Sequence, residues 1–111
     1  MSPEPTDPLR NYLRVVESIP PLAPQEERRL WPSVKRNDDD LARKRLLEGS
    51  LHLVTPIARR YEGRGVLLID LIQEGNIGLV RAVELFDPSE GGAFSSFAGR
   101  HIQAAIVKAI H

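Results

Sequence analysis

The stretch DLIQEGNIGLVRAVELFD, residues 70–87, decides the fold. When it is placed on a helical wheel at about 100° per residue, its apolar side chains gather on one broad arc. They are Leu71, Ile72, Leu79, Ala82, Val83 and Phe86. This spacing predicts a helix over residues 70–86 whose apolar arc faces a core. Gly75 falls within the arc, where the lack of a side chain would let another helix approach closely.

The opposite arc of the same helix mixes polar side chains with one large apolar residue. Ile77 lies at its centre, surrounded by Asp70, Gln73, Glu74, Arg81 and Glu84. An apolar anchor within a polar ring is typical of a protein-binding face. Single exposed apolar residues are also common on ordinary protein surfaces, so both interpretations stay open on this pattern alone.

Residues 94–111, FSSFAGRHIQAAIVKAIH, predict the last helix. Its apolar face comprises Phe94, Ala98, Ile102, Ala105, Ile106, Ala109 and Ile110. Its other side carries Ser96, Phe97, Arg100, His101, Gln103, Val107 and Lys108, and the stretch contains no acidic residue. Aromatic rings beside cationic groups can stack unpaired bases while phosphates are held, which favours single-stranded nucleic acid as a ligand. The alternative is that Phe97 only extends the core.

The rest of the chain also predicts helices. Residues 7–19 predict one with Asp7 as N-cap and Pro8 at its first position. A further helical charge pattern contains Pro32, which we expect to kink or end that helix. Residues 1–6 are polar and rich in proline, and we expect a disordered tail. No segment alternates with period two, so the sequence predicts an all-α fold of five or six helices.

Composition excludes several classes of protein. The chain has 111 residues, 41% of them hydrophobic and 27% charged, with a formal net charge of zero. One domain with a modest core is therefore expected, without a global basic field. Cysteine is absent, no apolar run approaches a membrane span, and the three histidines lack metal-ligand spacing. No catalytic set of residues can be assembled, so we expect a protein that is not an enzyme. We also expect it to be cytoplasmic and to have no cofactor, no metal site and no membrane partner.

The stretch DLIQEGNIGLVRAVELFDP resembles the segment of primary-type bacterial sigma factors that binds core RNA polymerase. The resemblance continues upstream in DPLRNYLRVVESIPPLAPQEE and LLEGSLHLVTPIARRYEGRG, and downstream in FSSFAGRHIQAAIVKAI. It implies a compact helical bundle over residues 7–111 that is similar to the central domain of that family. Its functional parts would be an upstream helix at 7–19, a core-binding helix at 70–86, and a DNA-melting helix at 94–111 that is cut short.

The resemblance also implies site residues. Asp70, Gln73, Glu74 and Asn76 match positions that dock on the coiled coil of the polymerase beta-prime subunit, and the wheel adds Ile77 and Arg81. Arg10, Tyr12 and Leu13 match positions near the single-stranded DNA downstream of the minus-10 element. Phe94, Ser96 and Phe97 match positions near the flipped base of the melted strand. The basic face adds Arg100, His101, Gln103 and Lys108 as DNA-binding candidates.

The sequence also departs from the family pattern. Two adjacent tryptophans, which wedge the duplex at the upstream edge of the bubble, are replaced here by Arg100 and His101. The arginine–glutamine pair that follows them in the family is Gln103 and Ala104. Two hypotheses follow. In the first, the module docks on polymerase and contacts the non-template strand of the minus-10 region. In the alternative, it binds polymerase or an anti-sigma regulator without recognising a promoter.

Overall fold

The computed structural model describes residues 7–110, so the tail expected at residues 1–6 and the last residue, His111, lie outside the described residues. Within the described range the chain forms six α-helices and two short 3-10 helices, which confirms the predicted all-α class. In chain order these are α1 (Pro8–Ser18), α2 (Pro24–Asn37), α3 (Asp40–Glu48), η1 (Leu51–Leu53), α4 (Val54–Arg59), α5 (Leu68–Leu85), η2 (Pro88–Glu90) and α6 (Phe94–Ile110).

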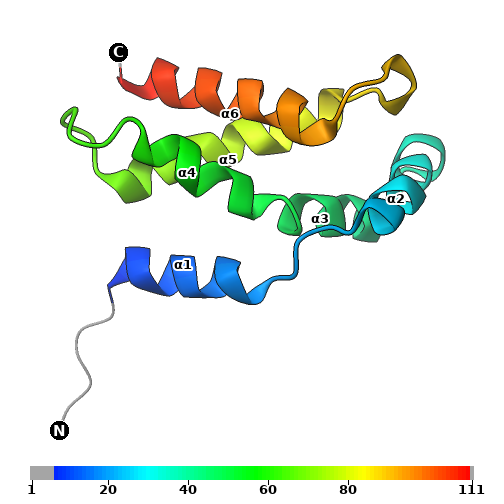
Figure 1. The fold of residues 1–111 in the computed structure, drawn as a ribbon, viewed down its shortest axis with the longest axis horizontal. Coiled ribbons are helices and arrows are strands. Elements are labelled where there is room, and N and C mark those ends of the chain that lie inside the picture. Colours follow the sequence, from blue (N-terminus) through cyan, green and yellow to red (C-terminus); the bar gives the residue numbers. More distant parts are fainter. Residues whose placement is uncertain (1–6, 111) are drawn as a thin grey trace, which may run out of the picture.

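The centre of the molecule is an antiparallel hairpin of α5 and α6, joined by the turn that contains η2 (Figure 1). Helices α3 and α4 follow one another along this hairpin and pack on α5. Helix α1 lies on the far side of α4 and α5 from α6, and α2 covers one end of the molecule. The resulting body is flat, with principal extents of 49 × 38 × 20 Å.

Helix α5 confirms the apolar arc that its sequence predicts. All six residues of that arc are buried, and Gly75 is buried with them. The helix spans Leu68–Leu85 rather than residues 70–86, so Asp70 lies inside its first turn. A carboxylate there interacts favourably with the unpaired N–H groups of the helix N-terminus.

The two glycines inside α5 permit close packing on both neighbouring helices. A Cβ atom built on Gly75 would lie 2.6 Å from Val54 Cγ1 of α4, and one built on Gly78 would lie 2.5 Å from the backbone oxygen of His101 in α6. Each glycine costs about 0.5–1 kcal/mol of helix propensity. The buried contacts that surround these positions offset that cost, so the glycines hold α4, α5 and α6 together.

Helix α1 begins and ends within one residue of the predicted range. The predicted N-cap is confirmed, because an Asp7 carboxylate oxygen accepts hydrogen bonds from the N–H groups of Leu9 and Arg10 at 3.0 and 3.4 Å. The helix ends at Ser18, and Ile19 returns to extended backbone before a segment that contains two prolines.

Of the two outcomes expected at Pro32, a kink or an end of the helix, the end is wrong, because α2 continues through Pro32 to Asn37. Pro32 is exposed, while Trp31 and Val34 on either side of it are buried in the core. These contacts keep the helix in place although Pro32 cannot donate a backbone hydrogen bond. The helix ends at Asn37, and the next residue, Asp38, takes the left-handed conformation with φ of 49°.

Candidate functional site

The exposed side of α5 is the first candidate surface. Ile77 is 60% exposed and Val80 beside it is 41% exposed. Val80 was not predicted as part of this surface, although its position three residues after Ile77 on one helix signals that the two are neighbours. Together with the polar residues around them they form a surface that we call the α5 face. Its members are Asp70, Gln73, Glu74, Ile77, Val80 and Arg81.

Asn76, which was expected to belong to the α5 face, instead points toward α1. Its side-chain Nδ2 donates a hydrogen bond to the hydroxyl of Tyr12 at 2.9 Å. Its Oδ1 atom is buried and has no donor among the described residues. The structure thereby joins two residues that the sequence analysis placed in different sites, because Tyr12 was expected to contact DNA. Both side chains are half-buried, and their bond attaches α1 to α5.

Phe94, at the start of α6, belongs to a buried cluster of aromatic rings. It is 4% exposed, and its ring centroid lies 5.1 Å from that of Trp31 and 5.2 Å from that of Phe86. The rings of Trp31 and Phe86 are 4.9 Å apart. This geometry gives edge and tilted contacts that stabilise the junction of α2, α5 and α6. Little of the Phe94 ring is left for a base to stack on.

Phe97 and His101 form a second aromatic pair, one turn apart on α6. Their ring centroids are 4.7 Å apart, and Phe97 also lies 5.3 Å from Phe86. Phe97 is half-buried, so it extends the core and still presents part of its ring at the surface. Ser96, Arg100 and Lys108 are exposed along α6. The helix thus offers one partly accessible ring, with Arg100 three residues after it and Lys108 about three turns after it.

The loop after α4 adds an aromatic and cationic pair that was not among the predicted site residues. Gln103 Nε2 of α6 donates a hydrogen bond to the hydroxyl of Tyr61 at 2.9 Å. The guanidinium of Arg64 lies 5.3 Å from the centre of the Tyr61 ring. Exposed Arg59 and Arg60 flank this pair. The local sequence ARRYEGRG was the available signal, but the contact with Gln103 spans 42 residues and could not be foreseen.

The expected DNA-binding residues do not meet in one place. Helices α1 and α6 lie on opposite sides of α4 and α5 (Figure 1). On α1, Arg10 is exposed, whereas Tyr12 and Leu13 pack against the core. A single ligand that touched both sets would therefore have to run across the molecule.

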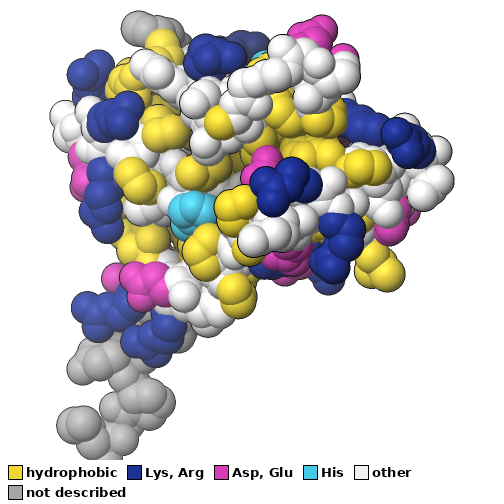
Figure 2. Space-filling view, turned by 45° about the vertical axis from the view of Figure 1, so that its right-hand side comes forward, with side chains coloured by type: hydrophobic (Ala, Val, Ile, Leu, Met, Phe, Trp, Pro, Cys, Tyr) yellow, Lys and Arg dark blue, Asp and Glu magenta, His cyan; other side chains and the backbone are white. Residues whose placement is uncertain are grey.

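A groove of about 730 Å³ lies at one end of the molecule, between the segment that follows α1 and the start of α6. It is lined by α2, by the segment between α1 and α2, and by the chain from Phe86 to the start of α6. Figure 2 turns this end forward and shows hydrophobic side chains around a hollow, with Lys and Arg at its edges. The lining reaches Pro21 and Leu22, next to α1, and also Phe94 and Ser95, where α6 begins.

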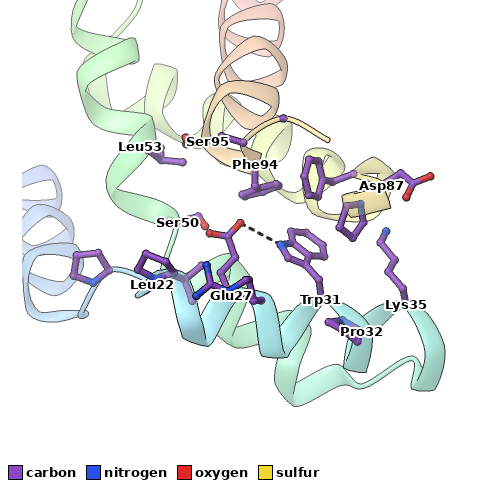
Figure 3. Close-up of a pocket in the computed structure, with 18 of the residues that line it drawn as sticks. Leu22, Glu27, Trp31, Pro32, Lys35, Ser50, Leu53, Asp87, Phe94 and Ser95 are labelled. Carbon is purple, nitrogen blue, oxygen red and sulfur yellow. Dashed lines mark hydrogen bonds between the residues drawn. The ribbon is translucent and has the colours of Figure 1, made fainter. Parts of the chain in front are cut away.

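The groove combines apolar walls with a polar rim. Arg28, Arg36 and His52 are exposed at its edges. Inside it, Trp31 Nε1 donates a hydrogen bond to Glu27 Oε1 at 3.2 Å, which fixes the orientation of that carboxylate (Figure 3). Lys35 Nζ lies 5.6 Å from the Trp31 ring centre and donates to the backbone oxygen of Glu84 at 3.2 Å.

Asp87 adds a further carboxylate at the end of the groove. Hydrogen bonds from the hydroxyl and N–H of Ser89 hold the pKa of Asp87 below its ordinary value of 3.8. Apolar walls with a few fixed donors, acceptors and cations suit an unstacked base with its phosphates.

Other kinds of site find no support between residues 7 and 110. In that range no three histidine or carboxylate side chains converge as a metal ligand set. None of the helices formed there has the length and apolar character needed to cross a membrane.

Comparison with known proteins gives a consistent result. The sequence model of the Sigma-70 region 2 family matches residues 46–111. The RNA polymerase sigma factor SigA of Clostridium acetobutylicum is 51% identical over 104 residues, which cover 94% of this chain and 27% of that protein. The protein of the same name from a Bacillus species is 46% identical over 104 residues, with the same coverage. The chain thus spans about a quarter of the length of these relatives.

Proposed function

Because the chain belongs to the Sigma-70 region 2 family, we propose that it is a non-catalytic module of transcription initiation. In this proposal residues 7–111 act as one helical domain that docks on bacterial core RNA polymerase. The docked module contacts the non-template strand of the promoter minus-10 region. The beta-prime coiled coil is the proposed docking partner.

The observation that carries the proposal is the α5 face. Its centre is an isoleucine that is 60% exposed at the middle of the longest helix. The exposed side chains of Asp70 and Gln73 and the half-buried side chain of Glu74 surround it with carboxylate and amide groups. Such groups suit a partner rich in arginine, because guanidinium–carboxylate hydrogen bonds are directional and strong. Burying Ile77 against that partner would add about 1.5–3 kcal/mol.

The groove and the outer side of α6 support the DNA contact. A single strand that passes Phe97 and Arg100 would meet the groove where α6 begins at Phe94. It would leave the groove beside Leu22, next to the helix that carries Arg10. If the strand continued along α1, it would also reach the exposed Arg10 near the start of that helix. The pair of Tyr61 and Arg64 extends the surface along α6 in the other direction.

The alternative of an interaction module that does not recognise promoters is not favoured by the similarity to complete sigma factors. The groove also weighs against it. A module that only docked through the α5 face would have no use for a hollow with a cationic rim at the start of α6. An anti-sigma regulator remains a proposed additional partner of the same α5 face.

The proposal is tested by measuring the affinity of the chain for core polymerase. Ile77→Ser should weaken binding by about 1.5–3 kcal/mol, because the variant loses the apolar anchor of the interface. Leu41→Ser is the matched control, since Leu41 is an 80% exposed aliphatic residue on α3, outside the α5 face. Equal effects of the two substitutions would contradict docking through the α5 face.

A further inference from the structure

Arg45 of α3 connects its helix to a segment far away in the sequence. Its Nε and Nη2 atoms donate to the two carboxylate oxygens of Glu26 at 2.7 and 2.9 Å. Its Nη1 donates to the backbone oxygen of Pro20 at 3.0 Å, and Nη2 also donates to that of Pro21 at 3.5 Å. One guanidinium therefore holds a carboxylate of α2 and two carbonyls of the segment between α1 and α2. The fixed fork of donors in arginine makes this combination possible.

The ion pair between Arg45 and Glu26 is partly shielded from water. The two side chains are 27% and 25% exposed. The hydrogen bonds from Arg45 lower the pKa of the Glu26 carboxyl. The paired orientation with two parallel bonds gives directional strength beyond that of an ordinary surface ion pair.

The segment that Arg45 holds, residues 19–23, is stiff. Pro20 and Pro21 have restricted φ angles and lack backbone N–H groups, so their carbonyl oxygens are the backbone groups available for fixing them. A stiff segment fixed at two successive carbonyls transmits its orientation to the helix that precedes it. The position of α1 is then coupled to α3.

Gly49 completes this attachment from the other side. A Cβ atom at Gly49 would lie 2.6 Å from Leu22 Cγ and 3.2 Å from Arg45 Nη1. Leu22 therefore packs directly on the backbone at Gly49, next to the guanidinium. Pro21 and Leu22 also line the groove, so the same contacts set the position of one groove wall.

Helix α1 has few other attachments. Val16 is its one buried residue, and Leu9, Tyr12 and Leu13 are half-buried. The bond between Tyr12 and Asn76 is its polar contact with α5. Such a lightly packed helix relies on the segment that follows it for its position.

We infer that Arg45 is a positioning residue, which fastens the segment between α1 and α2 to α3 and thereby sets where α1 stands relative to α6. Its consequence for DNA rests on the proposed function. If one strand runs from α6 through the groove to α1, Arg45 keeps α1 where the strand can reach it. Arg45 does not touch the strand itself.

The positioning role is tested by a distance measurement between two spin labels on the free chain. The chain has no cysteine, so Glu17→Cys on α1 and Ala104→Cys on α6, both exposed, give unique attachment sites. We expect a narrow distance distribution in this parent and a broad or shifted one after Arg45→Met, with helicity by circular dichroism unchanged. An unchanged distribution would overturn the inference.

Two further variants sharpen this measurement. Arg43→Met is the matched control, because Arg43 lies on the same helix, is 31% exposed and pairs with Asp38 and Asp40, away from the segment. It should keep the narrow distribution, and broadening as large as in Arg45→Met would count against a specific role. Arg45→Lys keeps the charge but cannot reach the carboxylate and the carbonyls together. Arg45→Lys should broaden the distance distribution, and it provides the test even if Arg45→Met fails to fold. A narrow distribution in Arg45→Lys would show that the simultaneous contacts of the guanidinium do not position α1.

The consequence for DNA is tested on the chain bound to core polymerase, with two single-stranded oligonucleotides. The short one covers the α6 surface alone, and the long one extends through the groove to α1. In the parent we expect tighter binding of the long oligonucleotide, and Arg45→Met should lose that gain while binding the short one equally well. A gain that persists in Arg45→Met would refute the coupling. If the parent binds neither oligonucleotide, the proposed DNA contact fails, and the label distances still decide the role of Arg45.

Discussion

Gly78 shows how a single position constrains the central hairpin. The nearest atom to a built Cβ is the backbone oxygen of His101, which cannot move without displacing α6. We predict that Gly78→Ala lowers the free energy of unfolding by about 1–3 kcal/mol through overpacking. Gly99 is the matched control in α6, because its nearest neighbour is a side-chain atom of Ile57 at 4.0 Å.

Gly99→Ala should raise the free energy of unfolding by about 0.5–1 kcal/mol, since alanine restricts the unfolded chain and favours a helix. Urea unfolding followed by circular dichroism measures both variants. A Gly78→Ala protein as stable as Gly99→Ala would mean that α5 and α6 do not pack as closely as described.

The Glu26 carboxyl makes the stability of the fold depend on pH in the acid range. The hydrogen bond from Arg45 lowers its pKa in the folded protein below the ordinary value of 4.5. A carboxyl whose pKa is lower in the folded state binds fewer protons there than in the unfolded state. Its stabilising contribution is therefore complete above about pH 4.5 and is lost as the pH falls through the lower folded pKa. We predict that Glu26→Gln makes the fall in stability below that pH less steep.

Thermal unfolding at a series of acid pH values checks the prediction for Glu26. Glu90→Gln is a suitable control, because Glu90 is exposed on η2, outside the contacts of Arg45. Identical pH profiles for the wild type and Glu26→Gln would show that the ion pair does not contribute to folding.

Helix α6 carries the change most relevant to promoter opening. Arg100 is exposed and His101 packs on Phe97. By the resemblance, these are the positions at which the family carries two tryptophans. Neither side chain can fill the space of a large planar ring against a base pair, although Arg100 can hold a phosphate or stack its guanidinium. We predict that the module opens an ordinary duplex promoter poorly and functions better on a template that is already melted.

A chimera provides the measurement for α6. Residues 1–111 replace the matching part of the Clostridium acetobutylicum SigA, and permanganate footprinting follows opening on duplex and pre-opened promoters. Arg100→Trp combined with His101→Trp should improve opening of the duplex and leave the pre-opened template unaffected. Efficient opening by the unmodified chimera would refute the prediction, and loss of function on both templates would favour the module that does not recognise DNA.

The helices also show where reasoning from sequence succeeds. Helices α1, α5 and α6 could be predicted closely because their signals are local, as with the Asp7 cap and the apolar arc around Leu79. The continuation of α2 through Pro32 could not, because it depends on burying Trp31 against Phe86 and Phe94 from distant segments. The exposed Ile77 was predicted from periodicity alone, and its role in docking stays a prediction.

The candidate site was less accessible to sequence reasoning than the fold. The groove, the bond from Gln103 to Tyr61 and the redirection of Asn76 toward Tyr12 all join residues more than 40 positions apart or come from several helices. No local pattern encodes such contacts. Many of the proposed participants were therefore identified from the sequence, but Asn76 points toward Tyr12 rather than out of the α5 face. Phe94 is buried as the apolar pattern of its helix predicts, so little of its ring is left for the DNA contact that the resemblance implies.

At the level of the whole molecule, the proposed functions are distributed over separate surfaces of a flat body with no net charge. The α5 face is proposed to bind polymerase, while α6, the groove and α1 are proposed to follow one DNA strand. Since the net charge is zero, the chain alone has no long-range attraction for DNA. Its few exposed cations predict weak binding of free single strands with a shallow dependence on salt. Docking on polymerase would hold the chain close to promoter DNA and so raise its effective concentration there.

Competition for core RNA polymerase tests most directly whether the α5 face is the surface that binds polymerase. The chain is titrated against fluorescently labelled SigA bound to core enzyme from Clostridium acetobutylicum. We predict that the wild-type chain displaces SigA, and that a Gln73→Ala, Glu74→Ala double variant does so at least tenfold more weakly, a loss of about 1.4 kcal/mol or more. Failure of the wild-type chain to displace SigA, or equal displacement by the double variant, would contradict docking of this module through the α5 face.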